Sequence, residues 1–235
     1  MSEYARIELG QISVIALSRH GGVSAAPYES LNLGSYVGDD PEHVAQNFAL
    51  VKKLVGAQQL TWLNANHGVT VNIATVSGQA PPGDGLVTSA RNHGIVALSA
   101  DCVPFALVDP INLVIAVGHA GWKGVLANLM NSLTQTFIQH GGVPENSDAV
   151  IGPSICGPCY EVAQDRVALF ADSMPSAIYD STHLALASGV KASLNELGFS
   201  TTQMAGCNFE DENLFSFRRA NGEATGRGGL VAIIN

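Results

Sequence analysis

The stretch SADCVPFALVDPINLVIAVGHAGWKG, residues Ser99–Gly124, decides the fold because it holds two apolar runs back to back. The runs Val103–Val108 and Leu113–Val117 have the length and composition of buried strands, and the Asp-Pro between them is typical of a tight turn. We therefore predict a hairpin. Cys102 precedes its first strand and His119 follows its second, and in an antiparallel pair these positions share one open end. A thiol and an imidazole are thus expected to converge there.

The rest of the chain mixes strand and helix patterns. We expect strands at 12–18, 60–63, 69–76, 94–100, 149–151, 214–218 and 230–234, and a turn at 78–84. We expect helices at 41–55, 122–140, 160–171 and 183–197, the first with Asp40 as its N-cap and Pro41 as its first residue. This order predicts an α+β fold, a single layered α/β sandwich domain with mixed sheets over residues 1–235.

Composition limits the class of protein. The chain has 235 residues and a formal net charge of −9, which argues against non-specific nucleic-acid binding. The N-terminus does not have the pattern of a signal peptide, and the sequence contains no apolar run long enough to span a membrane. Four cysteines in a chain of this length do not suggest a disulfide framework. We expect a cytoplasmic protein with reduced thiols, present as a monomer or a weak homo-oligomer.

The convergence of Cys102 and His119 has two chemical interpretations. His67, in LNANHGV, lies between two expected strands and could add a second imidazole, which gives the ligand set of a catalytic zinc site with one position left for water. Alternatively, Cys102 is a nucleophile with His119 as its base and Asp101 nearby, as in cysteine hydrolases. The spacing does not separate the two interpretations, and a cysteine at a strand start is also often a small buried hydrophobe.

The motif CGPC, Cys156–Cys159, also occurs in thioredoxins, where it forms a redox pair at a helix start. Here it follows Gly-Pro-Ser and precedes Tyr-Glu-Val, and we favour a rigid loop that leads into a helix. A C-x-x-C pair is also half of a structural zinc site. The remaining cysteine, Cys207, leaves such a site one ligand short unless a histidine joins it.

Six motifs in the same order along nearly the whole chain resemble the YfiH family, also called the laccase-domain or multicopper polyphenol-oxidase family. They are SRHGGVSAAPYESLNLGSYVGDDPEHVAQN, NHG, ADCVPFALVD, GHAGWKG, IGPSICGPCYEV and FSFRRANGEATGR. The resemblance implies purine nucleoside phosphorylase activity, with adenosine deamination and methylthioadenosine cleavage beside it. It also implies a zinc ion on His67, Cys102 and His119.

The sequence departs from the family pattern at several positions. Ala65-Asn66 replaces the usual Gln-Val, Lys123 replaces an Arg, Phe48 replaces an Arg, and HLAL replaces His-Leu-Asp-Leu at 183–186. None of these changes removes a metal ligand. The change beside His67 bears on substrate preference.

Phosphorolysis needs a cation for phosphate, and arginine binds such oxyanions bidentately. Arg19, Arg218 and Arg227 are the candidates, and Asn32 could contact the ligand through its amide. Surface solvation, ion pairing or, for Asn32, a turn are the structural alternatives. Asp101 could orient a metal-bound histidine as an acceptor, or it could equally cap a turn.

The resemblance thus implies a zinc-dependent purine nucleoside phosphorylase that acts on inosine, adenosine and methylthioadenosine with phosphate, and has adenosine deaminase as a side activity. Copper is less favoured, because no blue-copper set with an axial methionine occurs in a recognisable order. A metal-independent cysteine hydrolase using Cys102 and His119 and a non-catalytic zinc-stabilised binding protein remain as alternatives.

Overall fold

The computed structural model describes residues 3–235 and contains two six-stranded sheets. The first sheet has the order β1 (Glu3–Leu9), β2 (Ile12–Leu17), β12 (Gly228–Ile234), β7 (His93–Ser99), β3 (Gln59–Asn64) and β5 (Gly78–Pro82). The second has the order β11 (Ser200–Gln203), β10 (Asp148–Ile151), β8 (Val103–Asp109), β9 (Val114–Ala120), β6 (Gly85–Thr88) and β4 (Val71–Ile73). Both sheets combine parallel and antiparallel pairs, so the prediction of a layered α+β sandwich with mixed sheets is confirmed.

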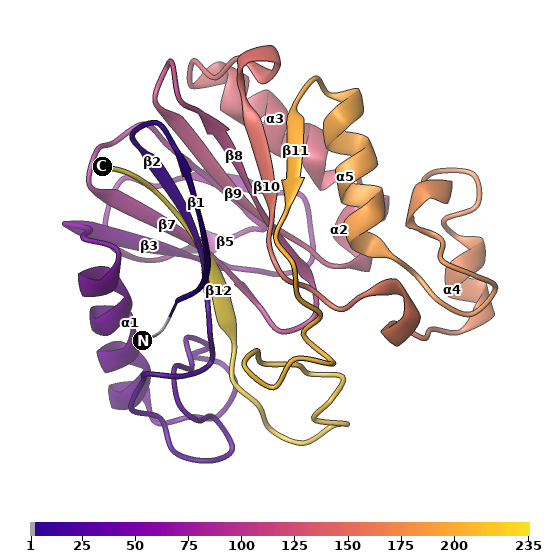
Figure 1. Cartoon of the computed structure of the whole chain (residues 1–235), viewed down its shortest axis with the longest axis horizontal. Coiled ribbons are helices and arrows are strands. Elements are labelled where there is room, and N and C mark those ends of the chain that lie inside the picture. Colours follow the sequence, from indigo (N-terminus) through magenta and orange to yellow (C-terminus); the bar gives the residue numbers. More distant parts are fainter. Residues whose placement is uncertain (1–2) are drawn as a thin grey trace.

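Helices cover the outer face of each sheet (Figure 1). Helix α1 (Pro41–Leu54) packs on the first sheet, and α3 (Leu129–Gln139) and α5 (Leu186–Glu196) pack on the second. The short helices are α2 (Trp122–Leu126), α4 (Gln164–Ala168), and the 3-10 turns Pro144–Asn146, Gly157–Cys159 and Pro175–Ala177. The result is a four-layer arrangement of helix, sheet, sheet and helices.

The central strands read as continuous apolar runs because both of their faces are buried. In β2, Val14 and Ala16 face the layer between the sheets, while Ile15 and Leu17 face the layer that holds α1. All six residues of this strand are buried. The same pattern in β8 and β9 explains why the hairpin could be recognised from its apolar residues alone.

Two local predictions are confirmed in detail. Asp40 caps α1 by accepting the backbone N–H of Glu42, and Pro41 is the first helical residue. Strands β8 and β9 form the expected antiparallel hairpin, with Asp109 paired with Val114 at its closed end. The carboxylate of Asp109 accepts the backbone N–H groups of the turn that follows.

Of the three helices expected downstream of the hairpin, one is interrupted, one is shortened and one is confirmed. The helix expected at 122–140 divides into α2 and α3, because Asn128 adopts a left-handed conformation with φ of 61° and caps α3 with its side chain. The helix expected at 160–171 is reduced to α4. The residues before it pair with another segment, since the N–H of Val162 donates to the carbonyl of Thr182. The helix expected at 183–197 is confirmed as α5, with a later start.

The strand predicted at 214–218 and the turn predicted at 78–84 are wrong. The 214–218 segment forms bends and turns, and Leu214 and Phe215 within it are buried. The Arg219 side chain donates a hydrogen bond to the backbone carbonyl of Leu214. Much of the 78–84 segment is instead β5, a parallel edge strand beside β3, where Pro81 and Pro82 are tolerated. Of the strand expected at 69–76, the structure keeps only β4.

Two further edge strands lie outside the strands predicted from the sequence. β1 alternates polar and apolar residues and is partly exposed, and β11 has the sequence STTQ. Among residues 3–235, no helix combines the length and apolar character needed to cross a membrane.

Candidate metal centre and cavity

The open end of the β8–β9 hairpin brings the predicted thiol and imidazole together. Val103 lies opposite Ala120, and Pro104 lies opposite His119, so Cys102 is carried to the same end as the His119 ring. His119 is buried, whereas Cys102 is partly exposed. The hairpin geometry expected from the sequence therefore holds in the structure.

His67 reaches the same place from the loop between β3 and β4. Its φ of 62° is left-handed, which directs its ring toward the hairpin end. The His67 and His119 rings meet edge to face with centroids 5.0 Å apart, and His67 Nε2 lies 3.9 Å from Cys102 Sγ. Three residues from separate elements thus surround one point.

Asp84, which precedes β6, holds both histidines in position. Its carboxylate accepts the backbone N–H of Asn66, His67 and Gly68, at 3.2, 3.0 and 2.7 Å respectively. The same carboxylate lies 2.9 Å from Nδ1 of His119. One fully buried side chain therefore fixes the loop that carries one imidazole and the orientation of the other.

The protonation states at Asp84 follow from its partners. Burial raises the pKa of this carboxyl, but the hydrogen bonds from His119 and from the backbone N–H groups outweigh burial and lower the pKa below its usual value. An ionised carboxylate only accepts hydrogen bonds, so Nδ1 of His119 is the donor and Nε2 is the nitrogen that remains to bind a metal. Burial lowers the pKa of this imidazole, but the Cys102 thiolate and Asp84 raise it to about 10, so a metal ion would displace the Nε2 proton. This carboxylate–histidine pair is the arrangement that orients imidazole ligands in metal sites.

The three side chains fit a single metal ion. Donor atoms of His67, Cys102 and His119 all lie within 4.8 Å of one another. Burial raises the pKa of the Cys102 thiol, but the neighbouring imidazoles of His119 and His67 lower it to about 6, which favours the thiolate that binds metals. The set is one sulfur and two nitrogens, with the exposed side of His67 facing a cavity.

Gly121 leaves the space that this cluster occupies. A Cβ at this position would lie 2.5 Å from Cδ2 of His67 and 3.3 Å from Sγ of Cys102. The first distance is well below van der Waals contact, so only glycine permits the close approach. This explains the glycine in the HAGW segment on structural grounds.

A cavity of about 440 Å³ opens beside the cluster. Arginine side chains of its lining lie against aromatic rings. Arg166 lies 4.6 Å from the centroid of the Trp122 ring, and Arg218 lies 5.2 Å from that of Tyr160. The Arg227 guanidinium lies 5.7 Å from the centroid of the Tyr36 ring and 5.6 Å from that of the Phe217 ring. The three cluster residues and Asp101 complete the part of the lining described here. The cavity thus combines flat apolar surfaces with positive charge.

Of the four residues predicted to bind substrate, two line the cavity and two do not. Arg218 and Arg227 line the cavity. Asn32 is buried behind it, where its Oδ1 accepts the backbone N–H of Arg227 at 2.8 Å. Arg19 lines a separate surface hollow, 3.7 Å from the carboxylate of Glu29 and 4.8 Å from the centroid of Phe215.

Asp101 does not orient an imidazole, contrary to the sequence-based expectation. Its Oδ2 accepts the backbone N–H of Arg218 at 2.6 Å, which holds the Arg218 segment at the cavity. Asp84 has the orienting role instead. The sequence analysis did not select it, although its setting between two glycines in GDGL is a weak signal. It also missed Arg166, Tyr36 and Phe217, which become neighbours only through long-range packing.

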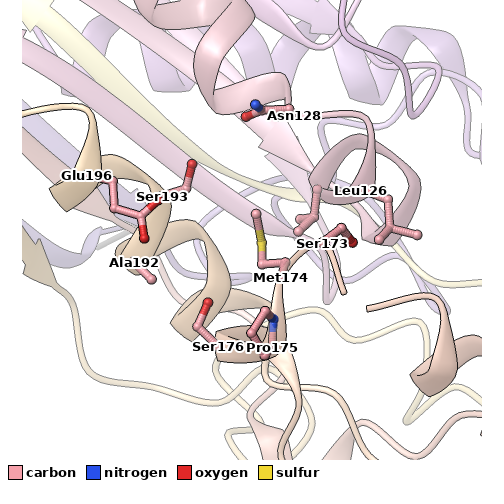
Figure 2. Close-up of a pocket in the computed structure, with 10 residues that line it drawn as sticks. Leu126, Asn128, Ser173, Met174, Pro175, Ser176, Ala192, Ser193 and Glu196 are labelled. Carbon is pink, nitrogen blue, oxygen red and sulfur yellow. The ribbon is translucent and has the colours of Figure 1, made fainter. Parts of the chain in front are cut away.

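A second cavity, of about 370 Å³, lies away from the metal cluster between α2, α5 and the 173–176 segment (Figure 2). Its lining combines Glu196 with neutral side chains such as Asn128, Ser193 and Met174. Figure 2 shows these side chains on the outer, helical side of the second sheet. We assign no chemistry to this cavity.

Comparison with known proteins finds a family model and several relatives that match most of the chain. The family model described as multi-copper polyphenol oxidoreductase laccase matches residues 13–235. A Streptomyces coelicolor protein named purine nucleoside phosphorylase is 37% identical over 86% of this chain and 87% of its own length. A Deinococcus radiodurans protein of the same name is 37% identical over 89% of this chain and 84% of its own length.

Solved structures show the same fold. YlmD from Geobacillus stearothermophilus superposes with a TM-score of 0.88 over the whole of both chains, at 23% identity. The YfiH protein of Bacillus licheniformis superposes with a TM-score of 0.86 at 25% identity, covering 96% of this chain and 93% of its own.

Proposed function

The chain belongs to the multi-copper polyphenol oxidoreductase laccase family, which includes the YfiH proteins, and from this premise we propose that it is a purine nucleoside phosphorylase. The reaction would take place in the cavity beside His67, Cys102 and His119. The observation that carries the proposal is the union, in one cavity, of a metal-ligand cluster, several arginines and several aromatic rings. The curated relatives named purine nucleoside phosphorylase support the same reading.

We propose zinc as the metal. One thiolate and two imidazoles form a zinc donor set that leaves a position open, and the Asp84–His119 hydrogen bond orients one imidazole as zinc sites require. A blue-copper centre adds a weak axial ligand, most often methionine. Among the described residues, the cavity lining contains no methionine, which favours zinc over copper.

Different side chains of the cavity would bind different parts of the substrate. The guanidinium groups of Arg218, Arg227 and Arg166 supply the positive charge that phosphate needs as it approaches C1′ of the ribose. The Tyr36 and Phe217 rings supply flat surfaces for the purine base. Asp101 accepts the backbone N–H of Arg218, so it would affect phosphate binding by keeping Arg218 in place.

The substrates in this proposal are inosine, adenosine and methylthioadenosine, with adenosine deaminase as a side activity. All three nucleosides share a purine ring that the aromatic lining would contact, and the methylthio group adds apolar surface that the same lining suits. When bound, zinc supplies a Lewis acid that lowers the pKa of a water molecule, which is the chemistry that deamination requires. Phosphorolysis would require the same cluster together with the arginines that bind phosphate beside it.

The test of phosphorolysis is incubation of purified protein with inosine, with and without inorganic phosphate. We expect hypoxanthine and ribose 1-phosphate to appear only when phosphate is present. His119→Ala should abolish the signal, whereas the matched control His20→Ala, on an exposed loop by the Arg19 hollow, should keep it.

Two other outcomes would contradict the proposal. Turnover that resists chelators but is lost on alkylation of Cys102 would indicate a metal-independent cysteine hydrolase. A Cys102→Ala variant with lower thermal stability, in a protein that consumes no tested nucleoside, would indicate a zinc-stabilised binding protein.

We also propose the cytoplasm as the compartment. The four cysteines of the sequence fall within the described residues and carry free thiols. A thiol that serves as a metal ligand must stay reduced, and the cytoplasm keeps thiols in that state.

A further inference from the structure

The CGPC motif is at one end of two neighbouring parallel strands. Strand β10 leads to Cys156 and Cys159, and strand β11 leads to Cys207. Because β10 and β11 are parallel, the segments that follow them leave the sheet at the same edge. The pairing continues beyond the strands as a bridge between Ser154 and Cys207.

A carboxylate completes this group. The Glu210 side chain lies with the three thiols, and donor atoms of all four residues are within 4.8 Å of one another. Cys156 Sγ is 4.0 Å from Oε2 of Glu210, and the backbone N–H of Cys156 donates to Sγ of Cys207 at 3.2 Å. In a tetrahedral site with Zn–S bonds of about 2.3 Å, neighbouring donor atoms are roughly 3.8 Å apart. The group is therefore close to the spacing that a metal ion imposes.

We propose that Cys156, Cys159, Cys207 and Glu210 form a second metal site, which binds zinc in a structural role. Three thiolates and one carboxylate fill all four positions of a tetrahedral ion, so the site is closed and leaves no position for substrate. The N–H to sulfur hydrogen bond at Cys207 supports a thiolate there, as outer-shell donors do in metal sites. On binding, the thiols lose their protons to solvent, and no oxidant or reductant is needed.

The geometry favours a metal over a redox pair. A thioredoxin-like pair places its first cysteine at the start of an α-helix, which activates that thiol. Here the motif forms only a 3-10 turn over Gly157–Cys159, and the chain then pairs with the 182–184 segment. A third thiol, that of Cys207, faces the pair, which a dithiol–disulfide couple does not require. All of these thiols are free in the structure.

The site would join two segments that form one wall of the catalytic cavity. Tyr160 directly follows Cys159, and Arg218 belongs to the segment that begins at Cys207. The Arg218 guanidinium lies 5.2 Å from the Tyr160 ring centroid and donates to the carbonyl of Glu161 at 2.8 Å. A metal ion at this edge would hold these segments in register without touching substrate. The proposal stands whether or not the cavity carries out phosphorolysis.

The test measures zinc in a protein whose first cluster has been removed. The double variant His67→Ala/Cys102→Ser lacks two ligands of that cluster, and we expect it to retain about one zinc per chain after purification. Adding Cys207→Ser should reduce this content to near zero. Because the readout is metal content, it does not depend on nucleoside turnover. A double variant that stays metal-free after equilibration with zinc would overturn the proposal, as would a zinc content that Cys207→Ser leaves unchanged.

An exposed ligand provides a variant that keeps its fold. Glu210 is exposed, and Glu212 is an exposed glutamate nearby that serves as its matched control. In the double-variant background, Glu210→Gln should weaken zinc binding by at least the roughly tenfold that loss of an outer-shell partner costs, and Glu212→Gln should leave it unchanged. Equal affinities for the two variants would count against Glu210 as a ligand.

Cobalt(II) gives an independent signature of the thiolates. Loaded into the double variant, it should show near-ultraviolet sulfur-to-metal charge-transfer absorption that decreases with each cysteine substituted. Intact mass analysis of the freshly purified double variant should show three free thiols. A Cys156–Cys159 disulfide found there in place of bound metal would overturn the proposal in favour of a redox pair.

Discussion

The buried carboxylate of Asp84 accepts a hydrogen bond from Nδ1 of His119 at 2.9 Å. The same side chain accepts the backbone N–H of His67 at 3.0 Å. Asp84 thus links the two imidazoles of the proposed zinc site, one through its ring and one through its backbone. The quality of the metal site should therefore depend on this carboxylate as much as on the ligands.

We predict that Asp84→Asn weakens zinc binding by about 10- to 100-fold, because an amide cannot fix the His119 tautomer as a carboxylate does. It also loses acceptor capacity for the N–H groups of the His67 loop. Competition with a chromogenic chelator measures the affinity, in a Cys207→Ser background that lacks the proposed second site. The matched control is Asp180→Asn, at an exposed aspartate in a turn, which should bind zinc like the unmodified protein. Similar affinities for both variants would show that Asp84 does not organise the site.

We predict that Gly121→Ala disrupts the same metal site by displacing the ring of His67. The new Cβ would lie 2.5 Å from Cδ2 of His67, so the ring must move away from Cys102. Turnover should decrease sharply, and zinc content should fall by about one ion per chain, because the proposed second site keeps its metal. Gly228→Ala is the control, because a Cβ there meets nothing closer than 3.8 Å. A fully loaded and active Gly121→Ala protein would mean that His67 is not held where the structure has it.

We predict that Arg227→Ala raises the KM for phosphate by about tenfold to a hundredfold, since a hydrogen bond to a charged group contributes about 1.5–3 kcal/mol. The backbone N–H of Arg227 keeps its bond to Asn32 in this variant, so the segment should stay in place. Steady-state kinetics with varied phosphate measure the effect. Arg6→Ala, on the outer strand β1, is the control and should leave KM unchanged. An unaltered phosphate KM in Arg227→Ala would remove this residue from the proposed phosphate site.

We predict an acid-dependent loss of stability that originates at His93. This histidine is buried in β7 and bonded to Thr61 at 2.8 Å, and burial lowers its pKa below the ordinary value of 6.5. Below pH 6.5 the unfolded chain binds a proton that the folded chain does not, so the free energy of unfolding decreases as the pH falls. The slope from one such group is at most about 1.4 kcal/mol per pH unit.

Urea unfolding at pH 7.5, 6.5 and 5.5 tests this contribution. His93→Gln should show a shallower decrease of stability below pH 6.5 than the unmodified protein. His140→Gln, at the partly exposed end of α3, should keep the original slope. Parallel pH profiles for His93→Gln and the unmodified protein would assign the acid sensitivity to other groups.

The hairpin and the meeting of Cys102 with His119 could be predicted because the information is local. Two apolar runs separated by a short turn fix both the pairing of β8 with β9 and the end at which Cys102 and His119 meet. The fit of Asp40 and Pro41 to the start of α1 is equally local. The layered class of fold followed from the order of such elements.

What the sequence left open depends on contacts between distant segments. Asp84 acts across 35 positions on His119, and the two glycines that flank it in GDGL are only a weak signal of this role. Strand β5 looked like a turn because its prolines are tolerated only at a sheet edge, and that position is set by pairing with β3. Arg166 was expected within a longer helix, and its place beside Trp122 depends on how that segment turns back. The position of the Glu210 carboxylate beside the CGPC thiols was likewise not anticipated.

The central claim is that His67, Cys102 and His119 share one zinc ion beside a nucleoside cavity. Anomalous X-ray scattering at the zinc edge, from crystals of the purified protein, tests it most directly. We predict a peak about 2.0–2.1 Å from a ring nitrogen of each histidine and about 2.3 Å from Sγ of Cys102. No peak at this position, in crystals of a protein that converts inosine and phosphate in the presence of a chelator, would contradict the account.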